Sequence, residues 1–326
     1  MNDVHVPVLV DEVMTMLAPA PGSLQIDGTV GGGGHAERML EATDPDGRLL
    51  GLDADGAAIA RVGERLRPRY GERLQLRKAN FRELATVAPE AGFGSVDGCF
   101  FDLGLSSFQL ADTERGFGFR AGGPLDMRFD RSRGVPVADL LATLDASALA
   151  ALFRRYGEEP FAGRIARAIV EARSAAPVRT AEALATLIER AAPSRIAGRR
   201  RVHPATRVFQ ALRIAVNEEL DALAEGLSAA LDLLRPGGHM AVLSYHSLED
   251  RIVKQFFQAE RRGCNCPPEA PVCVCGRAPR VRLVTPKGIT PGEEEIALNP
   301  RARSARLRVA EQIGRASCRE RVCLAV

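Results

Sequence analysis

Residues 27–40 read "DGTVGGGGHAERML", with four consecutive glycines between a short apolar run and a segment of helical spacing. A glycine turn between a strand and a helix lets backbone N–H groups approach a ligand at the helix N-terminus. Asp53 ends the next predicted strand, where an acid accepts hydrogen bonds from ribose hydroxyls. Together these features indicate a site for an adenosine-containing cofactor. A tight turn beside a solvated acid is the structural alternative.

The sequence around the glycine turn alternates apolar runs with helical segments. Strands are predicted at 23–30, 47–55, 73–81 and 95–107, and helices between them at 35–43, 56–68 and 82–88. The runs are almost continuously apolar, which is typical of strands buried on both faces. Strands and helices in alternation predict a parallel sheet with right-handed crossovers.

This alternation stops between residues 108 and 205, where loops and helical spacing occur without a convincing strand. A long helix is predicted after "HPATR" (203–207), then a fifth strand in "HMAVLSY" (239–245), with Ser247 capping the next helix. Two further strands, at 281–284 and 305–311, can complete the sheet. The predicted fold is therefore α/β, a parallel-type, seven-stranded Rossmann-like sheet with an inserted helical domain.

The predicted domain boundaries follow from this division. Residues 1–108 and 206–312 form a discontinuous sheet domain, and 109–205 the inserted, mostly helical domain. The last segment, 313–326, has no periodicity, which indicates either a join foreign to the fold or a disordered native tail.

Composition narrows the class of protein. The 326 residues carry a formal net charge of +3, so there is no polybasic tail. The amino end has early acids and no signal-peptide pattern, and no apolar run reaches the roughly 20 residues of a membrane span. These observations predict a cytoplasmic protein without a membrane segment.

Arginine is far more frequent than lysine in this chain. Codon bias explains a general excess of arginine, so only clusters of arginines indicate a binding surface. Five arginines lie in "RIAGRRRVHPATR" (195–207), and the candidates for contact with an RNA backbone are Arg199, Arg200, Arg201 and Arg207. A solvated charged face is the alternative interpretation.

Four cysteines in "CNCPPEAPVCVC" are close enough to bind zinc: Cys264, Cys266, Cys273 and Cys275. Their C-x-C spacing differs from the usual C-x-x-C knuckle, so a loop with free thiols is preferred and no metal is predicted.

Longer motifs connect the chain with a known family. "IDGTVGGGGH", "FDLGLSSFQL", "GPLDMRFD", "HPATRVFQALRIAVNEEL", "SYHSLEDRIVK" and "NPRARSARLRVAE" resemble the ribosomal RNA small-subunit methyltransferase H family, over residues 5 to 312. The resemblance implies a methyltransferase sheet and S-adenosylmethionine as the methyl donor. The implied substrate is N4 of a cytidine in the decoding region of 16S rRNA, within the 30S subunit or its precursor.

The resemblance also implies a set of site residues. The cofactor contacts would be Gly33, Gly34 and His35 in the turn, Asp53 on the ribose, Phe81 near the adenine, and Asp102 and Gln109 closing the site. Two positions depart from the usual family pattern: Phe108 replaces a proline and Tyr245 a phenylalanine.

Methyl transfer to a cytosine amine needs an acceptor for the amine protons. Asp102 is the first candidate, and Asp126 and His246 are the second ones. Asp126 can instead form an ion pair with Arg128 or Arg131, and His246 can cap the following helix.

Two other functions compete with methyl transfer: a nicotinamide-dependent oxidoreductase, which the glycine turn alone permits, and a non-catalytic RNA-binding factor.

Overall fold

The computed structural model describes residues 7–119, 122–192, 203–263, 266, 275 and 277–314. The chain divides into two compact units, a sheet unit of Met1–Gly104 with Asp221–Val326 and a helical unit of Leu105–Leu220. The second boundary differs from the predicted one at 205. Helix α10 (Ala205–Asn217) belongs to the helical unit because its Val208, Phe209 and Leu212 are buried in that unit's core.

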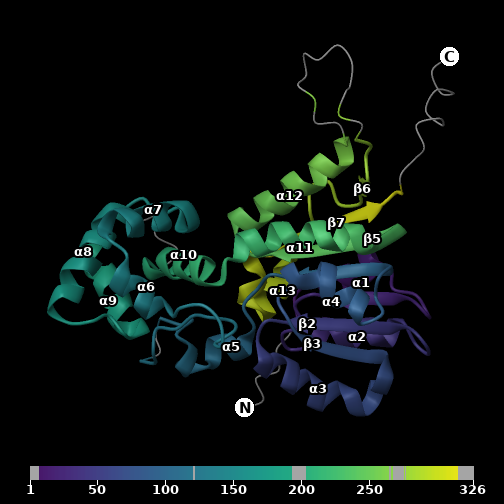
Figure 1. The fold of residues 1–326 in the computed structure, drawn as a ribbon, viewed down its shortest axis with the longest axis horizontal. Coiled ribbons are helices and arrows are strands. Elements are labelled where there is room, and N and C mark those ends of the chain that lie inside the picture. Colours follow the sequence, from purple (N-terminus) through teal and green to yellow (C-terminus); the bar gives the residue numbers. More distant parts are fainter. Residues whose placement is uncertain are drawn as a thin grey trace. The chain divides into compact units, whose positions relative to one another are not determined.

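The sheet unit contains seven strands in the order β3-β2-β1-β4-β5-β7-β6, as predicted in number (Figure 1). Their bounds are β1 Leu24–Asp27, β2 Arg48–Asp53, β3 Leu74–Lys78, β4 Val96–Asp102, β5 Leu234–Ser244, β6 Val281–Leu283 and β7 Arg306–Gln312. In the parallel part, Ile26 of β1 lies opposite Leu50 of β2 and Cys99 of β4.

One strand corrects the expectation of a parallel sheet. Strand β7 runs antiparallel to both neighbours, with Ala241 of β5 opposite Val309 and Arg282 of β6 opposite Glu311. An antiparallel neighbour needs no crossover helix on the sheet face. The chain from β6 to β7 accordingly passes through only the short helix α13 (Glu293–Leu298) and a 3₁₀ turn. The sheet is therefore mixed and mostly parallel.

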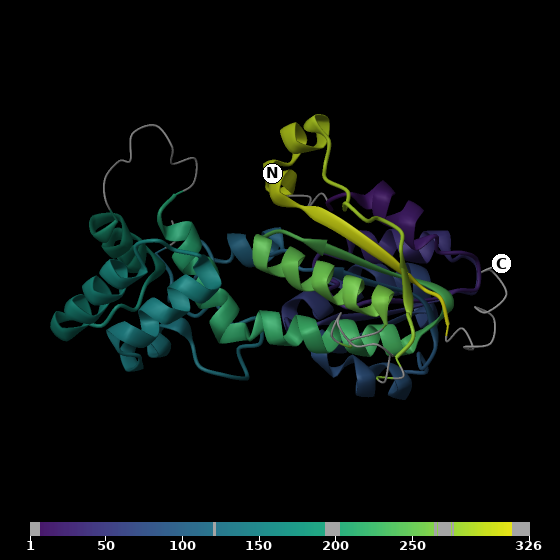
Figure 2. The ribbon, with the colours of Figure 1, turned by 90° about the horizontal axis from the view of Figure 1, so that it is seen from above.

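Helices cover both faces of the sheet. The bounds of these helices are α1 Val10–Leu17, α2 Gly34–Ala42, α3 Gly56–Tyr70, α4 Leu84–Glu90, α11 Glu219–Leu233 and α12 Ser247–Arg262. One core joins α1, α2 and α3 to one face, and the other joins α4, α11 and α12 to the opposite face. Figure 2 shows α11 and α12 side by side along the sheet.

Side-chain alternation explains the two cores. In β4, Phe100 belongs to the core under α2, whereas Phe101 belongs to the core under α11. Successive strand residues point to opposite faces, so a continuously apolar strand fills both cores. Helix α1 is an element that the sequence prediction omitted.

The helical unit contains the remaining helices: α5 Ser107–Ala111, α6 Val137–Thr143, α7 Ala146–Gly157, α8 Ala162–Ala175, α9 Ala181–Ala191 and α10. Asp145 separates α6 from α7, and its side chain accepts a hydrogen bond from the backbone N–H of Ala148. One long helix was predicted after residue 207, but the structure has two, α10 and α11. Glu218 separates them, because it adopts a left-handed conformation with φ of 50°.

Among the residues that the structure describes, no helix is long and apolar enough to cross a membrane.

Candidate active site

Three of the first four strands, which pair in parallel, end in an aspartate. Asp27 ends β1, Asp53 ends β2 and Asp102 ends β4. The carboxyl ends of parallel strands meet at the same edge of a sheet, and β1 lies between the other two. Ligands of open α/β sheets bind at this edge. The three carboxyl groups therefore surround the glycine turn.

Backbone hydrogen bonds hold the glycine turn to both neighbouring strands. The N–H of Gly28 donates to the carbonyl of Phe100 at 2.9 Å, and the N–H of Val30 donates to that of Leu52 at 2.8 Å. A side chain on Gly28 would collide with the ring of Phe101, so the turn is packed against β4 as well. The turn is a rigid part of the sheet edge.

The third and fourth glycines of the run are required by packing against protein. Gly33 has φ of 77°, and a Cβ there would lie within 3.1 Å of Val62 and of the Arg65 guanidinium. A Cβ on Gly34 would lie 2.8 Å from the ring of Pro7. The absent side chains thus let α3 and the N-terminal segment approach the turn, a role that sequence reasoning did not assign.

Asp53 orders the turn from β2. Its Oδ2 accepts from the N–H of Gly31 at 2.9 Å, and its Oδ1 accepts from the N–H of Asp55 at 2.8 Å. Burial raises the pKa of Asp53 to about 6, although these two hydrogen bonds lower it. A carboxylate has about four lone-pair sites, so two remain for hydroxyl donors. Two such acceptor sites suit the hydroxyl donors of a ribose in an adenosine-containing cofactor.

Asp102 is held by groups from three parts of the edge. Its backbone N–H donates to Thr29 Oγ1 at 2.6 Å, and its Oδ1 accepts from the N–H of Gly104 at 3.1 Å. The buried hydroxyl of Tyr245, which follows β5, is hydrogen-bonded to the Asp102 carboxylate. Burial and the Asp102 charge raise the pKa of Tyr245 well above its ordinary value, so it stays a donor.

His35 lies behind Asp102. Its Nε2 is 3.0 Å from the carbonyl oxygen of Val8, and its Nδ1 is 3.9 Å from Asp102 Oδ2. The ring packs on Phe100 with centroids 4.6 Å apart, and only 6% of the residue is exposed. These contacts fit a histidine that positions the turn and Asp102 from inside the protein.

Asp27 is the most buried of the three acids, with 1% exposed. Its Oδ1 accepts from the N–H of Thr29 at 3.0 Å. Burial, together with the charges of Asp102 and Asp53, raises the pKa of Asp27 to about 8, although the Thr29 hydrogen bond lowers it. Sequence reasoning did not single out Asp27, although its position directly before the turn was a usable signal.

Phe81 follows β3 and is half-buried. Its ring meets Phe101 edge-on at 5.4 Å between centroids, and it lies so close to Gly226 of α11 that a Cβ there would collide with it. The ring is therefore fixed beside the edge where Asp53 ends β2, in keeping with an adenine contact.

Within the helical unit, two of the predicted residues have structural partners. The side-chain carbonyl of Gln109 accepts from the N–H of Ser106 at 3.1 Å, completing a capping box at the start of α5. Asp126 is bound by Arg128 at 2.7 Å and by Arg131 at 3.3 Å. Burial would raise the pKa of Asp126, but the hydrogen bonds and charges of these arginines outweigh burial and lower it.

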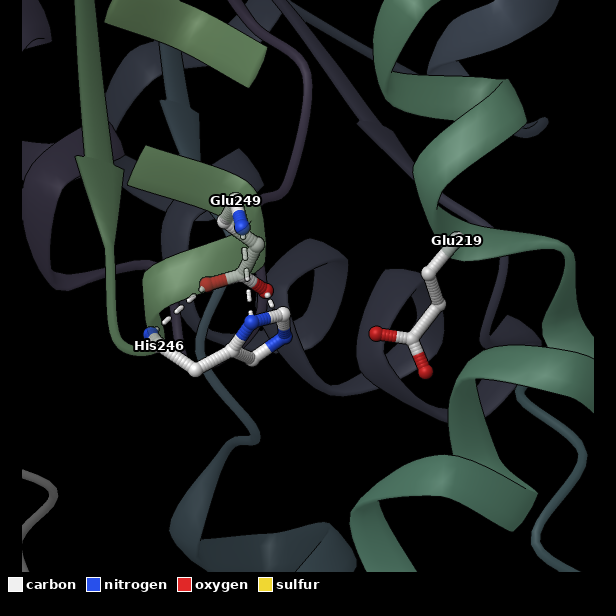
Figure 3. Close-up of side chains that lie close together, drawn as sticks. All are labelled: Glu219, His246 and Glu249. Carbon is white, nitrogen blue, oxygen red and sulfur yellow. Dashed lines mark hydrogen bonds and ion pairs between the residues drawn. The ribbon is translucent and has the colours of Figure 1, made fainter. Parts of the chain in front are cut away.

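His246 caps α12, one residue earlier than the predicted cap at Ser247. Its Nδ1 accepts from the N–H of Glu249 at 3.4 Å, and its Nε2 lies 3.0 Å from Glu249 Oε1 (Figure 3). The carboxylate of Glu249 in turn accepts from the N–H of Tyr245 at 2.8 Å. The strand-to-helix turn that carries Tyr245 is therefore fixed by this reciprocal cap.

Several predicted residues lie outside the described part of the chain, namely Arg199, Arg200, Arg201, Cys264, Cys273 and the tail from 315. Of the arginine cluster, Arg207 is described, and its exposed guanidinium donates to the carbonyl of Glu158 at 3.2 Å. Cys266 and Cys275 are half-buried.

Comparison with known proteins agrees with the motifs. The model of the MraW methylase family matches residues 2–313. A protein of Thermomicrobium roseum named ribosomal RNA small subunit methyltransferase H is 55% identical over 313 residues, 96% of this chain and 95% of its own length. Proteins of the same name from Syntrophotalea carbinolica and a Geobacter species are each 52% identical over 309 residues, 95% of this chain and 98% of theirs. The chain therefore belongs to the MraW methylase family.

Proposed function

We propose that this chain transfers a methyl group from S-adenosylmethionine to N4 of a cytidine in the decoding region of 16S rRNA, in the small ribosomal subunit or its precursor. The observation that carries the proposal is the edge where Asp53 and Asp102 flank the glycine turn, in a member of a methylase family. Its full-length relatives are named as methyltransferases of small-subunit ribosomal RNA.

The hydrogen-bond acceptors and the apolar ring at the sheet edge fit the cofactor. Asp53 keeps two acceptor sites for ribose hydroxyls after binding Gly31 and Asp55. Phe81 offers a fixed apolar ring beside this edge. Helix α2 begins at Gly34 beside the turn and has no side-chain cap, and the N-terminus of a helix favours a negative group such as the carboxylate of a methionine moiety.

The chemistry assigns Asp102 the main role. The N4 amine of cytosine is a weak nucleophile because its lone pair is delocalised into the ring. S-adenosylmethionine, when bound, supplies an electrophilic methyl group on a sulfonium and leaves as a neutral thioether. Asp102 would orient the amine and accept the proton that it loses as the N–C bond forms. Gly104, Tyr245 and His35 hold the carboxylate for this task.

The other candidates receive structural roles in this proposal. Asp126 fixes its loop through Arg128, and His246 caps α12, so neither is free to serve as the first proton acceptor. We assign substrate recognition to the helical unit, with Arg199, Arg200, Arg201 and Arg207 as phosphate contacts.

Transfer of tritiated methyl groups to purified 30S subunits tests the proposal. The label is expected in 16S rRNA as N4-methylcytidine. Asp102→Asn keeps the size of the side chain but weakens it as a proton acceptor, so the rate should fall by about 100-fold or more. The control is Asp46→Asn, at an exposed loop position. If no methyl group is transferred to RNA, the proposed activity is contradicted. If the rate of Asp102→Asn is undiminished, the role of Asp102 as proton acceptor is contradicted.

A further inference from the structure

The helical unit contains a cavity whose lining combines aromatic rings with acids. Its volume is about 320 Å³, at the lower end of the roughly 300–1,000 Å³ typical of small-ligand pockets. It is lined by Phe119, Glu182, Ala185, Thr186, Glu189 and His203. All six belong to the helical unit, whereas the candidate active site is formed by residues of the sheet unit.

Two rings form a rigid stack in this cavity. The rings of Phe119 and His203 are stacked in almost parallel planes, with an interplanar angle of 15° and centroids 4.4 Å apart. The imidazole is fixed at both nitrogens, because Nδ1 accepts from the N–H of Ala205 at 3.2 Å and Nε2 lies 2.7 Å from Glu189 Oε1. Phe119 is fixed in turn by an edge-on contact with Phe209 at 5.7 Å.

The stack keeps part of its surface accessible. Phe119 is half-buried, and 31% of the His203 side chain is exposed. A preformed aromatic surface that reaches solvent suits a flat ring, since base–aromatic stacking is a general means of holding unpaired nucleotides.

The acids around the stack determine which kind of flat ring the cavity can bind. A carboxylate accepts hydrogen bonds, so it pairs with exocyclic amino groups such as N4 of cytosine and repels the carbonyl edge of uracil. Glu182 lies in the first turn of α9, with Oε2 3.7 Å from the position of a Cβ on Gly122. Glu189 lies about two turns further along the same helix, and one of its oxygens binds His203. Thr186 supplies a hydroxyl between them.

We propose that this cavity binds one unstacked nucleobase bearing an exocyclic amine, from the RNA substrate, by stacking on the accessible part of the Phe119–His203 pair and by hydrogen bonds to Glu182. The proposal rests on the proposed RNA substrate. It adds a second base-reading position, in the helical unit, to the methyl-transfer site on the sheet edge. Phosphates are bound elsewhere, because the carboxylates of this cavity repel them.

Binding of fluorescent five-nucleotide single-stranded RNAs to the full chain tests the proposal by anisotropy. One probe has a central cytidine and the other a central uridine, in an otherwise all-uridine strand. The cytidine probe should bind about tenfold more tightly. Glu182→Met should abolish this preference, leaving the uridine affinity unchanged. Phe119→Leu should weaken both probes about tenfold, because the stacking surface is lost.

The controls separate this site from the active site and from the fold. Glu171→Met, at an exposed position of α8, should change neither affinity nor preference. Asp102→Asn should keep the cytidine preference, since a preference lost with Asp102 would place the base at the sheet edge and overturn the proposal. S-adenosylmethionine affinity and melting temperature report whether each variant is folded. If Phe119→Leu does not fold, the cytidine preference of Glu182→Met alone tests the proposal.

Equal binding of both probes by the wild type, or a cytidine preference that survives Glu182→Met, overturns the proposal. The proposed function fails by a different result, the absence of methyl transfer from the wild type to 30S subunits.

Discussion

Replacing Asp27 with asparagine should change how stability depends on pH. Asp27 is buried beneath the glycine turn, and burial raises its pKa from 3.8 to about 8. Asparagine has the same shape, and its Oδ1 can still accept from the N–H of Thr29. The substitution therefore removes the titration and keeps the hydrogen bond.

The sign and size follow from linkage. Between pH 4 and 8 the unfolded chain has released the Asp27 proton, whereas the folded protein still holds it. Each pH unit in this range therefore lowers the unfolding free energy of the wild type by about 1.4 kcal/mol through this group. Over the rise of about 4 units, the loss is on the order of 5 kcal/mol. The Asp27→Asn variant does not show this loss of stability, because asparagine does not titrate.

Urea unfolding followed by circular dichroism, at one-unit steps from pH 5 to 8, measures the effect; the chain has no tryptophan for fluorescence. The unfolding free energy of Asp27→Asn minus that of the wild type should increase with pH by about 1 kcal/mol or more per unit. A difference that is flat with pH would refute the reasoning, since it would mean that Asp27 is ionised in the folded protein.

Three further predictions concern the proposed site. Asp53→Asn should weaken S-adenosylmethionine binding about tenfold or more, as measured by calorimetry at pH 8. In the wild type the affinity should fall below pH 6, where Asp53 becomes protonated. An affinity that does not depend on pH would show that Asp53 does not bind the ribose. Tyr245→Phe should lower kcat about fivefold or more with KM for S-adenosylmethionine unchanged, because the hydrogen bond from its hydroxyl to the Asp102 carboxylate is lost. A change in KM alone would place Tyr245 in cofactor binding. Changing Arg199, Arg200 and Arg201 together to glutamine should weaken 30S binding and reduce the log–log salt slope by about 2, while cofactor affinity stays constant; an unaltered slope would make the cluster a solvated face.

The sequence was sufficient to predict the sheet because local patterns specify its strands and helices. The apolar runs that became β1 to β4 alternate with helical spacing, and in parallel sheets such an alternation leaves few topologies. The glycine turn and Asp53 were predictable because both follow strands at fixed places in the chain. The family resemblance, carried by long motifs, was confirmed by the full-length relatives.

Other features depend on contacts between residues far apart in sequence. No local pattern indicates that β7 inserts antiparallel between β5 and β6, since direction is set by pairing with both neighbours. Helix α10 joins the helical unit because of where its apolar face is buried.

Side-chain roles divide in the same way. The sequence alone placed a glycine turn, His35, Asp53 and Asp102 at or near the ends of strands. Only the tertiary structure decided what each one does. It placed Tyr245 on Asp102, packed Pro7 and Val62 against the glycines, and buried Asp27 deeply enough to raise its pKa to about 8. Hydrogen-bond partners and desolvation depend on distances across the fold, and sequence spacing does not contain those distances.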